Sequence, residues 1–182
     1  MEKATYILTA VVQKAQKGDV KAMASLYQQF SKAMFNICFR MCGNVPDAED
    51  VLQESFLTAF KNLHQLKDEN LFGGWVKRIV VNNCIQHSKK TFYWDNWKED
   101  EDIANEEQES FWDEVDLPKL NDCIKQLPNG CRQIFTLYAV EDYTHKEIAV
   151  QLGITEGTSK SQYARAKTLL KEKIIAQISY NG

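Results

Sequence analysis

The chain has 182 residues, of which 44% are hydrophobic, and its formal net charge is −3 at pH 7. This composition excludes an intrinsically disordered protein, and because no apolar run approaches ~20 residues we expect no membrane insertion. The charge is unevenly distributed: residues 1–90 carry +4, residues 91–118 carry −10 and residues 119–182 carry +3. The net charge therefore describes none of the three segments, since an acidic segment separates two mildly basic ones.

The five cysteines, Cys38, Cys42, Cys84, Cys123 and Cys131, lie mostly among apolar residues. An odd and scattered set favours reduced, buried thiols in a cytoplasmic protein over a disulfide framework. Cys38 and Cys42 are four residues apart, but neither a histidine nor a second cysteine pair completes a zinc site there. We therefore expect no metal and no other cofactor.

Helical patterns cover most of the first ninety residues. We expect a short helix over residues 2–17 and a second over residues 20–41, with Gly43 after its end. A third helix is expected from residue 44 to about residue 66, with Pro46 tolerated in its first turn. Its inward stripe consists of Leu52, Phe56, Ala59, Phe60 and Leu63.

The opposite face of this third helix is acidic and consists of Asp47, Asp50, Gln53, Glu54 and Leu57. The helix dipole favours acids in the first turn, which explains Asp47 and Asp50 without any function. Three carboxylates on one face also suggest a metal or acid–base site, but no histidine or second carboxylate cluster supports one. A polar, acidic face that contains an apolar residue suits a protein partner better.

A loop at residues 67–71 leads through Phe72-Gly73-Gly74 to a helix expected over residues 75–90. Its inward residues are Val76, Ile79, Val80 and Cys84. Its opposite side, near Trp75, is lined by Arg78, Asn82, Gln86 and Lys89. Cations, amides and an aromatic ring on one face are what single-stranded nucleic acid requires. A tryptophan at such a position is, however, more often part of the core.

Residues 91–116 lose the helical period and become strongly acidic, which predicts a linker that ends near Pro118. Residues 117–127 predict a helix that stops at Pro128-Asn129-Gly130, and another helix is expected over residues 132–140. No segment has a convincing strand pattern. The predicted fold class is all-α, with one helical domain over residues 1–90, an acidic linker over 91–116 and a second helical domain over 117–182.

The second domain continues with two helices separated by a short turn. Thr144 and Glu147 have the spacing of a capping box, so a helix begins at His145, and Gly153 ends it. Thr155 is a second N-cap only two residues after Gly153. Two short helices joined by so short a turn predict a helix-turn-helix.

The second helix of this motif has two distinct sides. The inward side consists of Ser159, Tyr163, Ala166 and Leu170. The outward side is small, polar and basic, and consists of Thr158, Ser161, Ala164 and Arg165, with Lys160 and Lys167 on its flank. Such a surface fits the major groove of DNA and contacts base edges and phosphates there. The alternative is an ordinary amphipathic helix pair with a solvated basic side.

Together these segments resemble the sigma-70 family of RNA polymerase sigma factors, in its extracytoplasmic-function (ECF) group. The first domain carries the resemblance in AQKGDVKAMASLYQQFSKAMF, DAEDVLQESFLTAFKNL and FGGWVKRIVVNN. The second domain carries it in LPNGCRQIFTLYAVEDYTHKEIAVQLGITEGTSKSQYARAK. The DAEDVLQESF run and the KEIA…LGI…EGT-x-KS…RA run are each specific, and both occur here in the family's order.

The resemblance implies a protein that binds the clamp and flap of core RNA polymerase, directs it to promoters and helps to open the DNA. The acidic face of the third helix matches the surface that docks on the clamp. The acidic linker would extend through the polymerase towards the RNA path, and an anti-sigma factor is a further implied partner.

Two groups of residues would contact promoter DNA. The fourth helix and the loop before it match the element that melts the minus-ten region and holds the non-template single strand, through Leu66, Asn70, Phe72, Trp75, Arg78, Asn82, Gln86 and Lys89. The second helix of the helix-turn-helix matches the element that reads the duplex at minus thirty-five, through Thr155, Thr158, Lys160, Ser161, Ala164, Arg165 and Lys167.

Three positions depart from the family's pattern. Ser159 stands where Val or Ile is common, Gln162 stands where Arg is common, and Gln86 stands where an acidic residue is frequent. These departures bear on the detailed contacts in the groove and on promoter preference.

A stand-alone regulator and an enzyme are the two alternative classes of function. A stand-alone helix-turn-helix transcriptional regulator would explain residues 128–175, but it leaves the acidic helix face and the fourth helix without a role. An enzyme is not expected, because His64, His87 and His145 are isolated. The chain also has no nucleophilic triad, phosphate-binding glycine loop or HExxH motif.

Overall fold

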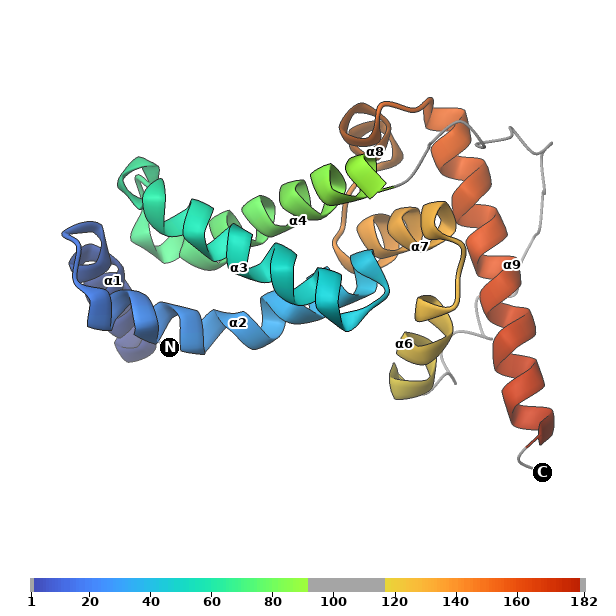
Figure 1. Ribbon diagram of the computed structural model, residues 1–182, viewed down its shortest axis with the longest axis horizontal. Coiled ribbons are helices and arrows are strands. Elements are labelled where there is room, and N and C mark those ends of the chain that lie inside the picture. The colour runs from blue at the N-terminus through green and yellow to red at the C-terminus, as the bar shows by residue number, and fades with distance from the viewer. Residues whose placement is uncertain (1, 92–116, 181–182) are drawn as a thin grey trace. The chain divides into compact units, whose positions relative to one another are not determined.

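The computed structural model describes residues 2–91 and 117–180, and the chain divides into two compact units, Met1–Thr91 and Phe92–Gly182 (Figure 1). Every regular element within the described residues is helical, which confirms the all-α fold class. Apart from Thr91, the expected linker over residues 91–116 lies outside the described residues. Among the described residues, no helix has the length and apolarity that crossing a membrane requires.

The first unit contains four helices, α1 (Glu2–Gln16), α2 (Val20–Cys42), α3 (Val45–Lys61) and α4 (Phe72–Thr91). Helices α2, α3 and α4 pack against one another, and α1 packs on α2. The Asp19 side chain caps α2 by accepting from the backbone N–H groups of Lys21 and Ala22, and Gly43 ends the helix at φ 83°. That left-handed conformation suits glycine, which has no Cβ to clash.

The connection between α3 and α4 differs from the expected one. Helix α3 ends at Lys61 rather than near residue 66, and two 3-10 turns follow, η1 (Leu63–Gln65) and η2 (Glu69–Leu71). Helix α4 begins at Phe72, three residues earlier than expected, and takes in both glycines. A Cβ on Gly73 would lie 3.0 Å from the Phe30 ring, so a larger residue at this position would require that ring to shift.

The second unit contains α6 (Leu117–Lys125), α7 (Asn129–Phe135), α8 (His145–Leu152) and α9 (Glu156–Tyr180). A π-helical turn, η4 (Thr136–Val140), extends α7. Helix α7 begins at Asn129 rather than at residue 132, so Asn129 and Gly130 belong to its first turn and not to a stop. The core of the unit consists of Cys123, Ile124, Leu127, Cys131, Phe135, Ala166, Leu170 and Ile174.

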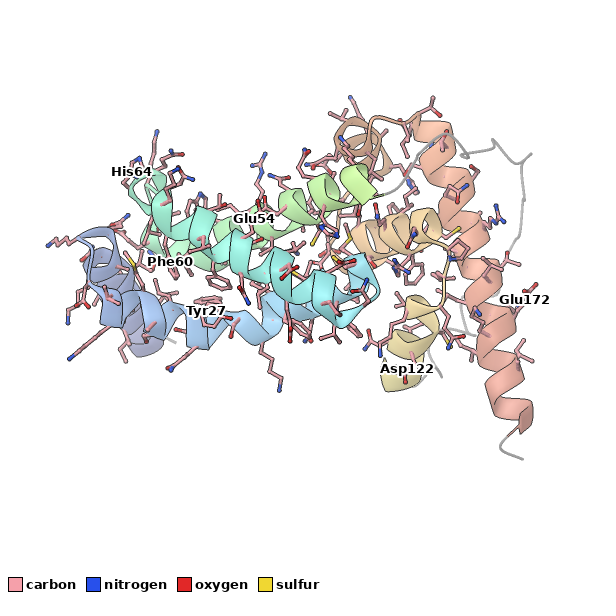
Figure 2. The ribbon with its side chains drawn as sticks, in the orientation of Figure 1. Tyr27, Glu54, Phe60, His64, Asp122 and Glu172 are labelled. Atoms are coloured by element: carbon pink, nitrogen blue, oxygen red, sulfur yellow. The ribbon has the colours of Figure 1, made fainter. Side chains whose placement is uncertain are left out.

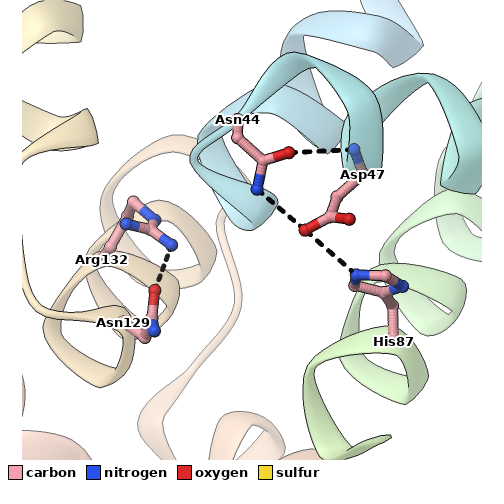
Figure 3. Close-up of polar contacts among 5 residues, drawn as sticks. All are labelled: Asn44, Asp47, His87, Asn129 and Arg132. Carbon is pink, nitrogen blue, oxygen red and sulfur yellow. Dashed lines mark hydrogen bonds and ion pairs between the residues drawn. The ribbon is translucent and has the colours of Figure 1, made fainter. Parts of the chain in front are cut away.

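Buried Arg132 fixes the turn between α6 and α7. Its Nη1 donates to the backbone carbonyls of Lys125 and Leu127, each at 3.2 Å, and its Nη2 donates to the Asn129 side chain (Figure 3). The guanidinium therefore satisfies carbonyls at the end of α6 that have no partner within the helix.

The helix-turn-helix is confirmed, and α8 begins and ends where predicted, but α9 is a long helix of 25 residues rather than a short one. The Thr144 hydroxyl accepts from the Glu147 backbone N–H at 3.2 Å, and the Glu147 carboxylate accepts from the Thr144 N–H at 2.8 Å, which completes the capping box. Gly153 ends α8 in the left-handed region at φ 73°. The Thr155 hydroxyl then accepts from the Thr158 N–H at 3.0 Å and caps α9.

All five cysteines are buried and none forms a disulfide, as expected. In the first unit, hydrogen bonding to Cys38 and Cys42, together with burial, raises the pKa of the Cys84 thiol. Within the described residues, no group of three or more His, Cys, Asp or Glu side chains could hold a metal ion.

Candidate nucleic-acid interface

The outward side of α4 carries a row of polar side chains. Arg78, Asn82 and Gln86 are exposed at intervals of four residues, and Lys89 is exposed one turn further on. Residues four apart are neighbours on a helix surface, so a cation and two amides lie side by side along its length. This row can neutralise phosphates and donate to or accept from base edges. The expected orientation of these four side chains is confirmed.

Of the three aromatic or apolar residues expected at this interface, two are buried and the third is half-buried. Phe72 is completely buried and meets the Phe30 ring edge to face at 5.1 Å, and Leu66 is also buried. Trp75 is half-buried, with its ring centroid 6.2 Å from that of Phe72. The sequence predicts that Leu66 and Phe72 contact DNA, but both are buried and support the loop instead.

The loop between α3 and α4 has a buried base and exposed tips. Leu63, Leu66 and Phe72 anchor it in the core, while Leu71 has 61% of its surface exposed. The Asp68 carboxylate accepts from both the backbone N–H and the side-chain amide of Asn70, each at 3.0 Å. Buried anchors and local hydrogen bonds therefore hold the exposed residues of the loop, which are Lys67, Asp68, Asn70 and Leu71.

The outward face of α3 matches the expected acidic surface at four positions. Asp50, Gln53 and Glu54 are exposed, and Leu57 between them and the helix end is 72% exposed. Figure 2 labels Glu54 and Phe60 on this helix; Phe60 is half-buried and its ring lies 5.8 Å from Phe56, which the Tyr27 ring meets at 4.8 Å. An exposed leucine among acids gives this face both charge and an apolar contact point.

Asp47 differs from the rest of this face because other side chains of the unit hold its carboxylate. Asn44 Nδ2 donates to Asp47 Oδ2 at 2.8 Å, and His87 Nε2 of α4 lies 3.5 Å from the same oxygen (Figure 3). The hydrogen bond from Asn44, with a smaller contribution from His87, lowers the pKa of the Asp47 carboxyl. Asp47 therefore ties the start of α3 to α4.

The first turn of α9 departs from the expected outward side. Thr158 is only 5% exposed, and the Thr155 hydroxyl accepts from its backbone N–H and lies 2.8 Å from its hydroxyl. The prediction that Thr158 faces outward is therefore wrong. Lys160 is exposed as expected, but its Nζ lies 2.8 Å from Glu156 Oε1.

Further along α9 the outward side is narrower than expected. Arg165 is exposed, whereas Ser161 and Ala164 are half-buried. The Ser161 hydroxyl donates to the Thr158 carbonyl at 3.1 Å, and Lys167 Nζ lies 5.6 Å from the centre of the Tyr163 ring. Close approach to a DNA groove would be governed by Arg165 and by the small side chains of Ser161 and Ala164 that precede it on the helix.

The inward side of α9 is more polar than the helical pattern suggested. Ser159, Ala166 and Leu170 are buried as expected, but so is Gln162, which accepts a hydrogen bond from the Cys131 thiol at 3.1 Å. Ser159 Oγ lies 2.9 Å from His145 Nδ1. Ser159 and Gln162 are two of the three positions at which the sequence differs from the pattern of the family that it resembles.

Stacked rings surround the contact between His145 and Ser159. The His145 ring lies 4.1 Å from Tyr138 and nearly parallel to it, and Tyr163 packs on both, at 5.7 Å and 4.6 Å. Burial of the imidazole, and then the nearby charge of Lys160, lower the pKa of His145. The neutral ring is thus favoured where α8 meets α9.

Comparison with known proteins links these surfaces to one family. Residues 26–91 match the model of sigma-70 region 2, and residues 118–170 match the model of sigma-70 region 4. The first span contains α3, α4 and the loop between them, and the second contains the helix-turn-helix. Together the two spans cover more than half of the chain.

Individual relatives match over nearly their whole length. The chain is 26% identical over 178 residues to the ECF RNA polymerase sigma factor SigW of Bacillus subtilis (strain 168), covering 90% of this chain and 94% of SigW. It is 27% identical over 181 residues to the ECF RNA polymerase sigma-E factor of Haemophilus influenzae, covering 91% and 94%.

A solved structure shares the fold. CnrH, determined in complex with the cytosolic domain of CnrY, matches with a TM-score of 0.51 and 19% identity over 93% of this chain and 97% of CnrH. Both family regions are present in their expected order, and relatives of the same group align along the chain. The chain therefore belongs to the sigma-70 family of RNA polymerase sigma factors, in the ECF group.

Proposed function

We propose that this sigma factor divides its work among three surfaces: α3 docks on core RNA polymerase, α4 with the preceding loop holds the non-template strand, and α9 reads the duplex upstream. The observation that carries the proposal is the pair of exposed, complementary rows on α3 and α4. One helix presents carboxylates around a leucine, and the next presents cations and amides. Their chemistry suits a protein partner and a nucleic acid respectively.

The docking surface consists of Asp50, Gln53, Glu54 and Leu57, which we call the clamp face. Leu57 supplies an apolar contact of the kind found at the centre of interfaces, and the acids around it suit a basic partner surface. Asp47 is left out of this face, because Asn44 and His87 hold its carboxylate within the unit. We assign the clamp of core polymerase as its partner, and the flap as a partner of the second unit.

The strand-holding surface combines the polar row of α4 with the exposed tips of the loop. Arg78 and Lys89 would neutralise phosphates, while Asn82 and Gln86 present amides that can pair with the edges of unstacked bases. The loop tips Asn70 and Leu71 offer one polar and one apolar contact to a base that has left the stack. The buried Phe72 and Leu66 hold this loop rather than touch DNA.

The upstream reader is the outward side of α9, with Arg165 as its principal base-contacting residue. An arginine in the major groove pairs with the O6 and N7 edge of guanine or with a phosphate. Lys160 and Lys167 flank it and would contact phosphates, and Thr155, Ser161 and Ala164 would line the approach. The acidic linker would then cross the polymerase between the two promoter elements.

The role is one of binding and positioning, without catalysis, and we place it in the cytoplasm, where polymerase and promoter DNA meet. An anti-sigma factor is the expected regulator for this group. The alternative, a stand-alone helix-turn-helix regulator, is not favoured, because residues 26–91, which match sigma-70 region 2, would then have no function.

In vitro selection of promoters with reconstituted holoenzyme tests the proposal. Holoenzyme should enrich sequences with two conserved blocks, near minus thirty-five and minus ten, whereas core polymerase alone should enrich neither. The chain without polymerase serves as the second control. If it enriches the same two-block sequences unaided and never binds polymerase, the stand-alone regulator would be correct instead.

A further inference from the structure

Helix α1 precedes the part of the chain that matches sigma-70 region 2, which begins at residue 26. In Figure 1 this helix lies at the end of the first unit where α3 and α4 are connected. It packs on α2 and on both 3-10 turns of that connection, η1 and η2. Helix α1, which lies outside the residues that match region 2, therefore supports the loop between α3 and α4 to which we assign strand holding.

Three polar side chains on one face of α1 make these contacts. The Thr9 hydroxyl donates to Asn70 Oδ1 at 2.9 Å, and Gln13 Nε2 donates to the Glu69 carboxylate at 3.2 Å. Gln16 Nε2 donates to the backbone carbonyls of Leu63 and Leu66, at 3.2 Å and 3.0 Å. Residues 9, 13 and 16 recur at the spacing of one helical face.

The contacts act on the two features of the loop that matter for holding a base. Gln16 joins the carbonyl of Leu63, the first residue of η1, to that of Leu66, the residue after η1, and so sets the position of buried Leu66 and of the chain that follows it. Thr9 binds the amide oxygen of Asn70 while Asp68 binds its nitrogen, so the orientation of this exposed amide is fixed from both ends.

A loop that is ordered before binding does not have to lose that conformational freedom when the ligand arrives. The same hydrogen bonds would otherwise have to form, or be replaced by water, in the complex. The contact between Gln13 and Glu69 is exposed to solvent, so it contributes less than the half-buried contact of Gln16.

We infer that α1 is a positioning element for the loop that captures an unpaired minus-ten base, with Thr9 and Gln16 as its positioning residues. The inference rests on the proposed strand-holding role of that loop. Neither residue touches the base itself. Each acts through the loop, Thr9 on the Asn70 side chain and Gln16 on the backbone.

The test measures binding of holoenzyme to a single-stranded minus-ten oligonucleotide taken from a selected promoter. Each position of the strand is replaced in turn by an abasic site, and the ratio of intact to abasic affinity identifies the captured base. We expect Thr9→Val to lower that ratio by about 2- to 10-fold, the effect of one lost hydrogen bond on an equilibrium. Thr9→Ser keeps the hydroxyl and should restore the ratio.

Gln16→Met keeps the length of the side chain but removes both donated hydrogen bonds, and should lower the ratio at the same position. Lys14→Gln is the matched control, because Lys14 is exposed on another side of α1 and should leave the ratio unchanged. Circular dichroism and thermal unfolding of each chain show whether it folds. If Gln16→Met fails to fold, the Thr9 pair decides the question.

Two results would overturn the inference. One is a folded Thr9→Val chain whose ratio equals that of wild type. The other is an equal loss of affinity for the intact and every abasic strand, because α1 would then support the unit without positioning the loop. If wild type itself shows no base-dependent position, the strand-holding role of the loop fails first, and the inference fails with it.

Discussion

At the scale of single residues, Arg165 and Lys160 lie on one helix and differ in the contact each is placed to make. Arg165 is exposed on the outward side of α9, next to the half-buried small residues Ser161 and Ala164, which allow close approach to a groove. Lys160 is exposed on the flank and pairs with Glu156 at 2.8 Å. A surface pair of this kind is weak, so a DNA phosphate can compete for the lysine.

Replacing Arg165 with Ala should therefore weaken binding to the upstream element by about 1–3 kcal/mol and relax base preference at one position. Lys160→Ala is the comparison, since losing a phosphate contact should weaken binding evenly across sequences and reduce the salt slope by about one. Both effects can be measured with holoenzyme on a set of promoters with single substitutions near minus thirty-five. If Arg165→Ala weakens all of them equally, the arginine contacts phosphate and does not read a base.

We expect His145 to make the stability of the second unit depend on pH. Its pKa is lowered by burial and by Lys160, so the unfolded chain takes up the proton more readily than the folded one. The stability of the unit should be complete above the ordinary histidine pKa of about 6.5 and should fall as pH drops below it. Thermal unfolding at pH 7.5 and pH 5.5 should show a smaller acid-induced loss for His145→Gln than for wild type. His64→Gln, at an exposed position in the first unit, is the control.

At the scale of elements, α3 and α4 present opposite chemistry on neighbouring helices, so their roles can be separated by mutation. Reversing Asp50 and Glu54 to Lys should weaken polymerase binding and leave the helix content unchanged, because both side chains are exposed. Binding can be followed by the fraction of the chain that migrates with core polymerase. Normal binding by the folded double variant would place the docking surface elsewhere, and unfolding would show that these acids are structural.

Asn82 on α4 should act after duplex binding, when the strands separate. Asn82→Ala should reduce transcription from a duplex promoter, and a template already unpaired across the minus-ten element should recover much of it, since unpairing then costs nothing. The comparison is one transcription assay on the two templates. An equal defect on both would mean that base capture is lost rather than melting, and no defect on either would contradict the strand-holding face.

How far the sequence predicts these elements depends on whether the deciding contact is local. The capping box at Thr144 and the stop at Gly153 are local signals, and the helix-turn-helix lies where they predict. The start of α4 depends on how closely Gly73 approaches Phe30 of another helix, which no pattern within the segment reports. A paired glycine therefore suggested a break where the structure has a helical turn.

The same distinction explains the errors at the candidate site. The exposure of Arg78, Asn82 and Gln86 follows from the helical period alone. Thr158 lies on the outward side by angle, but it is buried in the folded unit, which the helical period alone does not predict. The contacts of α1 with the loop join residues more than forty positions apart, so they are visible only once the chain is folded.

At the scale of the whole molecule, two units with separate cores carry the surfaces that we propose for two separate DNA elements. The buried residues of α1 to α4 pack among themselves, and α6 to α9 form a core of their own. The acidic segment over residues 91–118 lies between two basic stretches in the sequence, so the net charge of −3 does not describe either unit. Linking two weak sites in one chain makes the second binding event intramolecular.

Two fragments, residues 1–116 and 117–182, should therefore each fold. Mixed together, however, they should support little transcription from a promoter at which the intact chain is active. Covalent linkage raises overall affinity by about 10²- to 10⁴-fold without any new contact, provided that both sites can be engaged at once. Circular dichroism first establishes that each fragment is helical and unfolds cooperatively. Transcription from a two-element promoter is then measured with core polymerase and either the intact chain or both fragments at equal concentration.

If the mixture of fragments gives as much transcription as the intact chain, polymerase itself holds the two units in place and the linkage contributes little. A fragment that does not fold would show that the units depend on each other for stability.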